Sequence, residues 1–299
     1  MSQHHMGFFS TTELSSSFKK PLSALHSSYK YIKLENGLRT LLVSDPKCTV
    51  TSAAMCVGAG SHSDPDDLPG LAHFCEHMLF MGTVEFPNPN DFRSKLSSMG
   101  GNANAYTMGD YTCVYFEVPM TDTLAGDELG LNYLMKNFSS FFKRPLFTES
   151  YMNMEVNSVD NEHEGNVVND EKILYHGWRL LSSEDHPFHR FGTGTKSTLN
   201  SKCTQKEMIK YYKANFVSTN MVLALKSPLS LNQLQKLAVT NFASIPEMRE
   251  SIGKPPNYKR RSKTKPRDSP IIDLESLDVR SEIFPSTCKI GRASCRERV

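Results

Sequence analysis

Alternating apolar and polar positions mark the predicted strands of this chain. Residues 29–34 and 38–43 alternate on either side of Asn36-Gly37, a dipeptide that is typical of a tight hairpin turn. Residues 49–57 form a third predicted strand, rich in small and β-branched side chains. Further strands are predicted at residues 102–107, 112–119 and 220–226.

Segments with helix start and stop signals lie between these strands. A loop over residues 58–70 leads into a helix that Gly70 opens, and a helix over residues 88–99 is closed by Gly100-Gly101. Other helices are predicted at residues 121–142, at residues 148–175, after the capping-box residues 204–207, and at residues 230–242. Because the strands occur in sequential runs between helices, the sequence predicts an α+β fold with a largely antiparallel sheet flanked by helices.

The composition indicates a soluble globular domain. The chain has 299 residues, of which 38% are hydrophobic, and a formal net charge of +2 at pH 7. This balance predicts no nucleic-acid partner, and no stretch approaches the roughly 20 apolar residues needed to cross a bilayer, so no membrane partner is expected. The seven cysteines are odd in number and include no Cys-x-x-Cys pair, which favours free thiols in a reducing, cytoplasmic compartment.

The ends of the chain differ from its middle. Residues 1–27 lack a continuous apolar stretch and are predicted to be a flexible tail without a signal peptide, and Glu13 and the absence of arginine argue against an organellar transit peptide. Residues 28–252 are expected to form the folded domain. Residues 253–288 combine prolines with a basic run and are predicted to be a linker toward a second domain. Residues 289–299 resemble the translation of a sequencing adapter, so we expect the natural reading frame to be lost just before them.

The chemistry of the chain centres on His73, Glu76 and His77 in the predicted helix after Gly70. Two histidines four residues apart share one face of a helix and can hold one Zn²⁺ together, with Glu76 beside them. This His-x-x-Glu-His order is the reverse of the commoner zinc-peptidase motif. Cys75, inside the motif, points away from the ligand face and is expected to be a packing residue.

A two-histidine zinc site needs a third protein ligand, usually a carboxylate. Glu155 and Glu162 are two helical turns apart in a later predicted helix, so they lie on one stripe. Either carboxylate could reach the metal while the other orients a histidine from behind. Spacing alone does not choose between them.

Several segments resemble the insulin-degrading enzyme group of inverted zinc peptidases, the pitrilysin-like family. The resemblance covers about residues 28–250, and its clearest motifs are residues 70–83, 101–107, 142–147, 155–164 and 186–194. It implies that His73, His77 and Glu162 bind zinc, that Glu155 supports the site, and that Glu76 is the general base. It also implies extended peptide substrates, which would dock as an added strand on Asn104-Ala105-Tyr106.

The resemblance further implies that this chain is the first domain of a four-domain clamshell peptidase. The remaining domains would then be its partners, and the chain is expected to hydrolyse peptides poorly alone. An alternative is a non-catalytic scaffold subunit, because the family's fold also serves as inactive core subunits. All five chemical positions are filled here, whereas such subunits lose motif residues.

Overall fold

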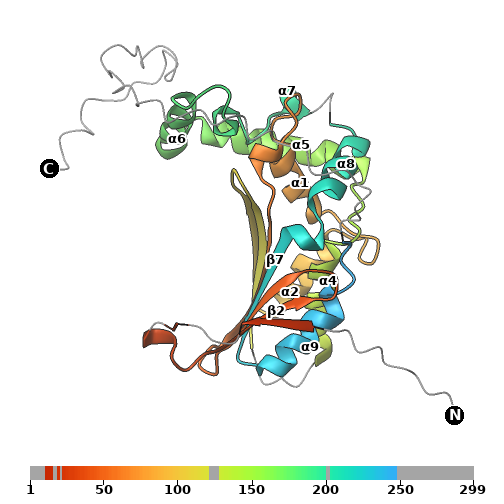
Figure 1. Ribbon diagram of the computed structural model, residues 1–299. Helices are drawn as coiled ribbons and strands as arrows, with labels where there is room; N and C mark the ends of the chain where they lie inside the picture. The colour runs from red at the N-terminus through yellow and green to blue at the C-terminus, as the bar shows by residue number, and fades with distance from the viewer. Residues whose placement is uncertain (1–10, 16–18, 21, 121–127, 200–202, 248–299) are drawn as a thin grey trace.

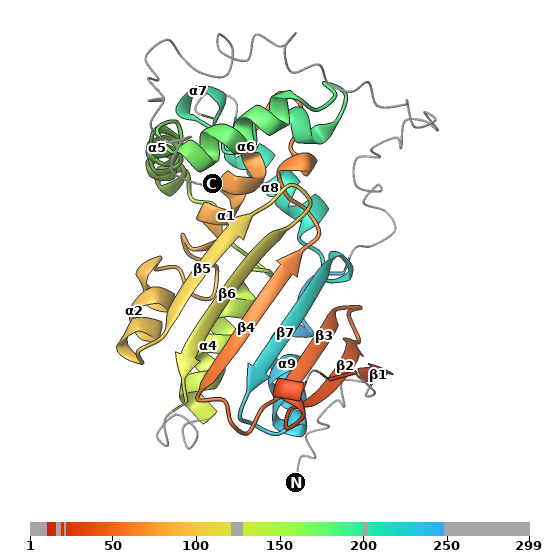
Figure 2. The same cartoon turned by 90° about the vertical axis from the view of Figure 1, so that its left-hand side faces the viewer.

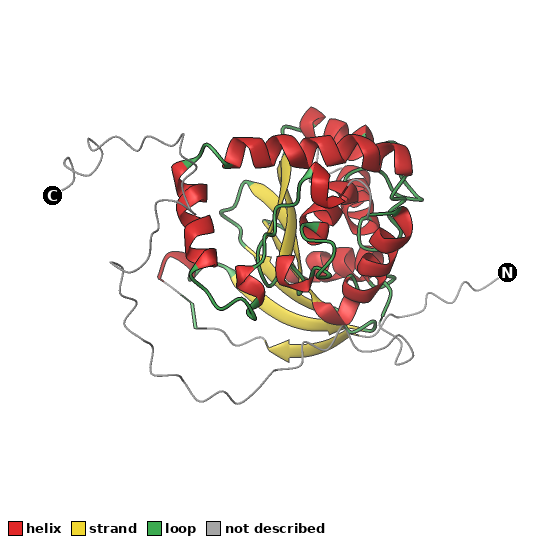
Figure 3. Ribbon diagram, turned by 90° about the horizontal axis from the view of Figure 1, so that it is seen from above, coloured by secondary structure: helices red, strands yellow, loops and turns green. Residues whose placement is uncertain are grey.

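A curved sheet of seven strands forms the frame of the computed structural model, which describes residues 11–15, 19–20, 22–120, 128–199 and 203–247 (Figures 1 and 3). The strands are β1 (Thr11–Ser15), β2 (Ser28–Leu34), β3 (Arg39–Ser44), β4 (Val50–Val57), β5 (Asn102–Thr107), β6 (Thr112–Pro119) and β7 (Met221–Ser227). The helices are α1 (Leu71–Leu79), α2 (Asn90–Ser98), α4 (Glu128–Ser140), α5 (Glu149–Asn166), α6 (Asp170–Leu180), α7 (Lys196–Leu199), α8 (Gln205–Asn215) and α9 (Leu231–Phe242). Short 3₁₀ turns are η1 (Leu22–Ala24), η2 (Ser61–Ser63), η3 (Pro187–His189) and η4 (Ser218–Asn220).

The strands lie in the order β1-β2-β3-β7-β4-β6-β5 (Figure 2). All neighbouring pairs are antiparallel except β3 and β7, which run parallel. The fold class predicted from the sequence, α+β with a largely antiparallel sheet flanked by helices, is therefore confirmed.

The hairpin between β2 and β3 forms at the predicted dipeptide. Gly37 has a positive φ of 83°, which an L side chain rarely adopts, and its N–H donates to the carbonyl of Leu34. The Asn36 side chain donates to the carbonyls of Phe242 and Ile245 at the end of α9. The turn is thus fixed both by its own backbone and by the last helix.

One face of the sheet is covered by helices and carries the core. Val114, Phe116 and Val118 alternate along β6 and are fully buried, whereas Glu117 between them is exposed. Helices α4 and α9 pack against each other on this side, and α2 packs on α4 and β5. The opposite face has no described helix lying over it (Figure 2).

Helices α1, α5, α6, α7 and α8 gather at one end of the sheet (Figures 1 and 2). Helix α1 contacts α5, α8 and strand β5, so it stands between the helical end and the sheet edge. Its apolar side chains, among them Phe74, Met78 and Leu79, are fully buried. This packing holds the helix with the histidine motif rigidly in the middle of the domain. Within the described residues, no helix has both the length and the apolar character needed to span a membrane.

Two features differ from the elements predicted from the sequence. The helix predicted over residues 148–175 is two helices, α5 and α6, because Asn169 is extended and its side chain accepts from the N–H of Lys172 as an N-cap. The predicted tail contains strand β1, which pairs with β2. The predicted linker (253–288) and the adapter-like segment (289–299) lie outside the described residues.

Candidate metal centre

Helix α1 has no capping side chain at its N-cap residue, Gly70. Instead, the backbone at Gly70 passes close to the backbone at Gly194. Gly70, its N-cap, has a φ of 93°, and a Cβ added there would lie 2.2 Å from the Cα of Gly194. The buried carboxylate of Asp64 accepts hydrogen bonds from the N–H groups of Gly70 and Ala72, both at 2.7 Å. These bonds satisfy donors that a helix start leaves unpaired, and they fix the direction of α1.

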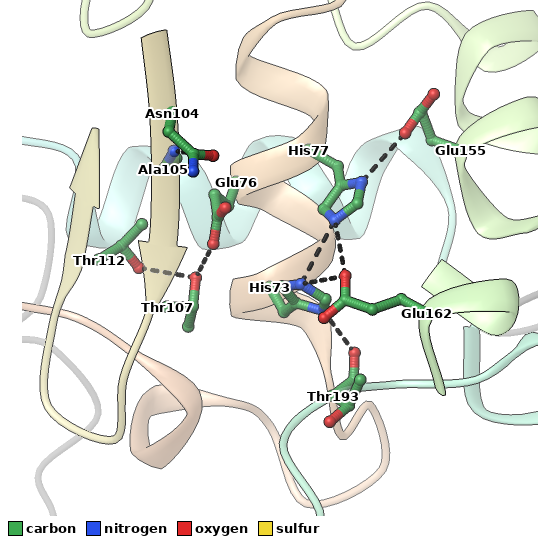
Figure 4. A network of polar contacts seen from close by, with 10 residues as sticks. All are labelled: His73, Glu76, His77, Asn104, Ala105, Thr107, Thr112, Glu155, Glu162 and Thr193. Atoms are coloured by element: carbon green, nitrogen blue, oxygen red, sulfur yellow. Dashed lines mark hydrogen bonds and ion pairs between the residues drawn. The ribbon is translucent and has the colours of Figure 1, made fainter. Parts of the chain in front are cut away.

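His73 and His77 lie on the face of α1 that meets α5, with their rings 4.8 Å apart between centroids. The Nδ1 atom of His73 donates to the carbonyl of Thr193 at 2.7 Å, and the Nδ1 atom of His77 lies 3.1 Å from Oε2 of Glu155. Because a carbonyl can only accept, the proton of a neutral His73 ring sits on Nδ1. The two Nε2 atoms face each other at 3.3 Å (Figure 4).

Glu162 completes a three-residue cluster with the two histidines. Its Oε2 atom lies 3.3 Å from Nε2 of His73 and 3.6 Å from Nε2 of His77. One potential ligand atom from each residue lies within 4.8 Å of the other two. Glu155, two turns earlier on α5, lies instead at the far nitrogen of His77 (Figure 4). The two carboxylates that spacing could not separate thus occupy different places.

Glu162 interacts with both histidines, and each of these interactions favours the charged forms of the groups involved. Hydrogen bonds from both histidines hold the pKa of Glu162 far below its usual range. Burial lowers the pKa of His77, but its hydrogen bonds to Glu155 and Glu162 outweigh burial and raise the pKa to about 9. His73 shows the same balance between burial and Glu162, and its pKa is also raised. Without metal, His77 therefore carries at neutral pH a proton that a bound cation would have to displace.

Glu76 points to a different side of α1, toward strand β5. Its side chain is buried, and Thr107 at the end of β5 donates a hydrogen bond to its Oε2 at 2.6 Å (Figure 4). Burial raises the pKa of Glu76, although the bond from Thr107 and the nearby histidines act in the opposite direction. A buried carboxylate with a raised pKa next to a cavity is suited to accept and return a proton.

Strand β5 is an edge strand beside this cluster. Within the described residues it pairs only with β6, and Asn104, Ala105 and Tyr106 line a cavity of about 460 Å³ together with the motif residues. The N–H of Ala105 donates to the side-chain oxygen of Asn104, the residue before it, and not to β6. The Ala105 N–H therefore points to the open edge of the sheet. Tyr106 is 42% exposed. The structure therefore brings all the site residues predicted from the sequence to one cavity.

The donor set fits a tetrahedral divalent metal such as Zn²⁺. Ligands about 2.0–2.1 Å from a tetrahedral zinc ion stand roughly 3.3 Å from one another. The three separations among His73, His77 and Glu162 are 3.3, 3.3 and 3.6 Å. Each histidine also has an oxygen acceptor at its other nitrogen, as metal-binding histidines usually do.

Three residues of the site were not predicted from the sequence. Thr193 orients His73, Thr107 holds Glu76, and Asp64 caps α1. Thr107 and Thr193 lie inside segments that carried the family resemblance, but no spacing rule assigned them a role. Cys75, which the sequence placed away from the ligand face, is fully buried and lies outside the cluster.

A helix that presents two histidines to a carboxylate on a second helix, beside an open sheet edge, is typical of metallopeptidases with the inverted motif. Residues 39–182 match the family described as Insulinase (Peptidase family M16), and the chain belongs to this family.

Several proteins of known name are similar to this chain. Insulin-degrading enzyme of Homo sapiens is 39% identical over 223 residues, which are 73% of this chain and 21% of that enzyme. A Schizosaccharomyces pombe protein whose name describes it as a zinc protease is 35% identical over 277 residues, 90% of this chain and 28% of that protein. The crystal structure of pitrilysin has a TM-score of 0.73 at 26% identity, covering 79% of this chain and 25% of that one. The chain thus spans about a fifth to a little over a quarter of the length of these relatives.

Proposed function

We propose that this chain is the metal-binding domain of a zinc-dependent endopeptidase that hydrolyses peptide bonds in extended peptides. The observation that carries the proposal is the convergence of His73, His77 and Glu162 within 4.8 Å, with Glu76 in the same cavity. The names of its relatives, an insulin-degrading enzyme and a zinc protease, support the same function.

In this proposal, His73, His77 and Glu162 would hold the zinc ion. When bound there, the ion would lower the pKa of a water molecule and polarise the carbonyl of the scissile bond. Glu155 keeps His77 oriented through their 3.1 Å contact and adds negative charge behind the ring. The carbonyl of Thr193 does the same for His73 without adding charge.

Glu76 is the proposed general base. As a carboxylate it takes the proton from the attacking water, and as an acid it returns that proton to the leaving amine. The hydrogen bond from Thr107 fixes one carboxylate oxygen, so Glu76 does not have to be ordered again in each cycle. Because Thr107 is the last residue of β5, this bond also ties the base to the strand where the peptide is proposed to bind.

The peptide is proposed to add to the open edge of β5 at Asn104, Ala105 and Tyr106. An extended peptide pairs with an exposed strand through backbone hydrogen bonds. The N–H of Ala105 points to this edge and is occupied by the Asn104 side chain. Binding would therefore require that side chain to release the N–H, after which its amide can contact the peptide.

Full activity is proposed to need the rest of the protein. The relatives are more than three times as long as this chain, so their other domains are the proposed partners that enclose the substrate. Alone, the chain is expected to fold and bind zinc but to turn over peptides poorly. Cleavage of a short fluorogenic peptide by this chain, abolished by a chelator, would contradict this expectation.

Zinc content separates the peptidase from a scaffold protein of the same fold. We expect one zinc ion per purified chain by atomic absorption, and loss of that zinc in His73→Ala and in His77→Ala. The matched control is His62→Ala, a histidine outside the cluster, which should retain full zinc content. A wild-type chain that takes up no stoichiometric zinc even when zinc is supplied would support the scaffold function instead.

A further inference from the structure

Two cysteines that are not part of the proposed metal-binding cluster face each other across neighbouring strands of the sheet. Cys56 on β4 and Cys113 on β6 are direct partners in the antiparallel register, and both are free thiols. Directly opposite residues of an antiparallel pair project their side chains from the same face of the sheet. Val114 and Met55, their neighbours in sequence, face the buried core, so the two thiols lie on the face without helices.

The hydrogen bonds at the ends of the strands show which kind of pair this is. The N–H of Met120 donates to the carbonyl of Thr49 at 2.8 Å, which makes Thr49 and Met120 a hydrogen-bonded pair at the end of the β4–β6 ladder. Hydrogen-bonded and non-hydrogen-bonded pairs alternate along an antiparallel ladder. Cys56 and Cys113 lie seven positions along the register from Thr49 and Met120. Because seven is an odd number, they are a non-hydrogen-bonded pair.

The hairpin between β5 and β6 gives the same answer independently. The N–H of Met108 donates to the carbonyl of Tyr111 at 2.8 Å, so the pair two steps along, Tyr106 and Cys113, is hydrogen-bonded. The backbone groups of Cys113 therefore bond to β5 and not to β4. In a non-hydrogen-bonded pair the Cα atoms are about 4.5 Å apart. Disulfides span Cα separations of roughly 4.4–6.8 Å, so a bond fits here, near its lower limit.

The two thiols differ in access. Cys113 is 9% exposed, and its thiol is in hydrogen-bonding contact with the hydroxyl of Tyr106. Cys56 is only half-buried. A small reagent would therefore reach Cys56 first, and Cys113 would be the second thiol to react.

We propose that Cys56 and Cys113 form a reversible disulfide between β4 and β6 when the protein meets a low-molecular-weight disulfide such as oxidised glutathione. The Cys56 thiolate attacks one sulfur of the reagent and releases one glutathione thiol, leaving a mixed disulfide. The Cys113 thiolate then attacks the Cys56 sulfur and releases the second glutathione. Two protein thiols are oxidised, one glutathione disulfide is reduced to two thiols, and the protons of the protein thiols pass to the released glutathione.

The bond is expected to be reversible, because each exchange step can run backwards, so reduced glutathione in excess should open it again. The bond also removes the Cys113 thiol from its contact with Tyr106, so oxidation changes the surroundings of one residue on the β5 edge. Burial raises the pKa of both thiols, so the exchange should accelerate as the pH rises from 7 toward 9.

The test is to equilibrate the full chain with mixtures of oxidised and reduced glutathione, block remaining thiols by alkylation, and map the digest by mass spectrometry. We expect a linked peptide pair containing Cys56 and Cys113, two hydrogen masses lighter than the reduced pair. It should disappear when reduced glutathione is in excess. Full alkylation of both cysteines under the most oxidising mixture, or a bond from Cys56 to any other cysteine, would overturn the proposal.

Variants test the order of the two steps. Cys113→Ser should trap glutathione on Cys56, because the second thiol is missing. Cys48→Ser removes another half-buried thiol, one without a cysteine opposite it in the sheet, and should leave the yield of the linked pair unchanged. Loss of the linked pair in Cys48→Ser would contradict the proposal. If Cys113→Ser does not fold, the mapping of the unmodified chain still decides the matter.

Discussion

Glu155 touches the outer nitrogen of His77, and Glu162 touches the inner one. The Oε2 atom of Glu155 lies 3.1 Å from Nδ1, whereas the Oε2 atom of Glu162 lies 3.6 Å from Nε2 of the same ring. The imidazole is held between two carboxylates, of which only Glu162 also reaches His73. The two acids should therefore respond differently to the same substitution.

Glu162→Gln should nearly abolish zinc binding, while Glu155→Gln should weaken it by about 10- to 100-fold. Loss of Glu162 removes a metal-binding oxygen and the charge that balances the cation. Loss of Glu155 leaves the three ligands in place but loosens one ring. Zinc titrations of both variants at one pH measure the difference. Weaker binding in Glu155→Gln than in Glu162→Gln would mean that the two roles are exchanged.

Glu76→Gln should retain zinc and lose turnover in the full-length enzyme. The amide keeps the shape of the side chain and can still accept a hydrogen bond from Thr107, but it cannot take a proton. General base catalysis contributes roughly 10²- to 10⁴-fold, so kcat should fall by about that factor. Steady-state peptide hydrolysis with zinc content measured in parallel checks this. A kcat close to that of the unmodified enzyme would exclude Glu76 as the base.

Zinc affinity should rise with pH up to about 9. Burial lowers the pKa of His77, but Glu155 and Glu162 raise it to about 9, so at neutral pH a proton occupies a ring that zinc must take. Below that pKa, the apparent Kd should fall about tenfold per pH unit for each proton released. Competition with a chromophoric chelator between pH 7 and 8.5 measures the slope. An apparent Kd that does not change over this interval would contradict the prediction.

The same shift has a stabilising effect in the protein without metal. The folded-state pKa of His77 lies above its ordinary value of about 6.5, so the stabilisation is fully present below pH 6.5. It should be lost as the pH rises through about 9. Urea unfolding of the chelator-treated chain across this range gives the comparison.

Gly70→Ala should destabilise the domain and weaken zinc binding together. The new Cβ would collide with the backbone of Gly194 at 2.2 Å and push away the segment whose Thr193 carbonyl orients His73. The positive φ of Gly70 adds strain of about 1–2 kcal/mol. Thermal unfolding and zinc titration of the variant measure both effects.

Gly165→Ala is the matched control. Gly165 lies in α5 with no atom within 4 Å of an added Cβ, so the substitution should stabilise the helix by about 0.4–1 kcal/mol. Zinc affinity should not change. A Gly70→Ala protein as stable as the Gly165→Ala protein would show that the crossing with Gly194 tolerates a side chain.

The sequence predicted the local elements of the fold better than their arrangement. The hairpin at Asn36-Gly37 and strands β5 and β6 were expected where they occur, because turn residues and alternation act over a few positions. The insertion of β7 between β3 and β4 was not expected, since pairing between distant strands leaves no periodic signal. The break between α5 and α6 depends on one asparagine cap inside a region that otherwise favours helix.

In the site, too, local spacing was predicted from the sequence and long-range contacts were not. His73, Glu76 and His77 were found because a helix fixes the distances between residues three and four apart. Spacing left Glu155 and Glu162 equivalent, and only the packing of α5 against α1 places them at different nitrogens. Thr107 and Thr193 act from separate segments through a hydroxyl and a carbonyl, which sequence spacing cannot reveal.

During synthesis, β3 and β4 leave the ribosome long before the strand that separates them. Residues 58–220 lie between β4 and β7 in the chain. Until Met221–Ser227 has been made, the facing edges of β3 and β4 have unpaired backbone groups, which can join strands of other nascent chains. Sheets closed by such distant contacts also fold slowly. The domain is therefore expected to depend on protection by chaperones until β7 has paired with both β3 and β4.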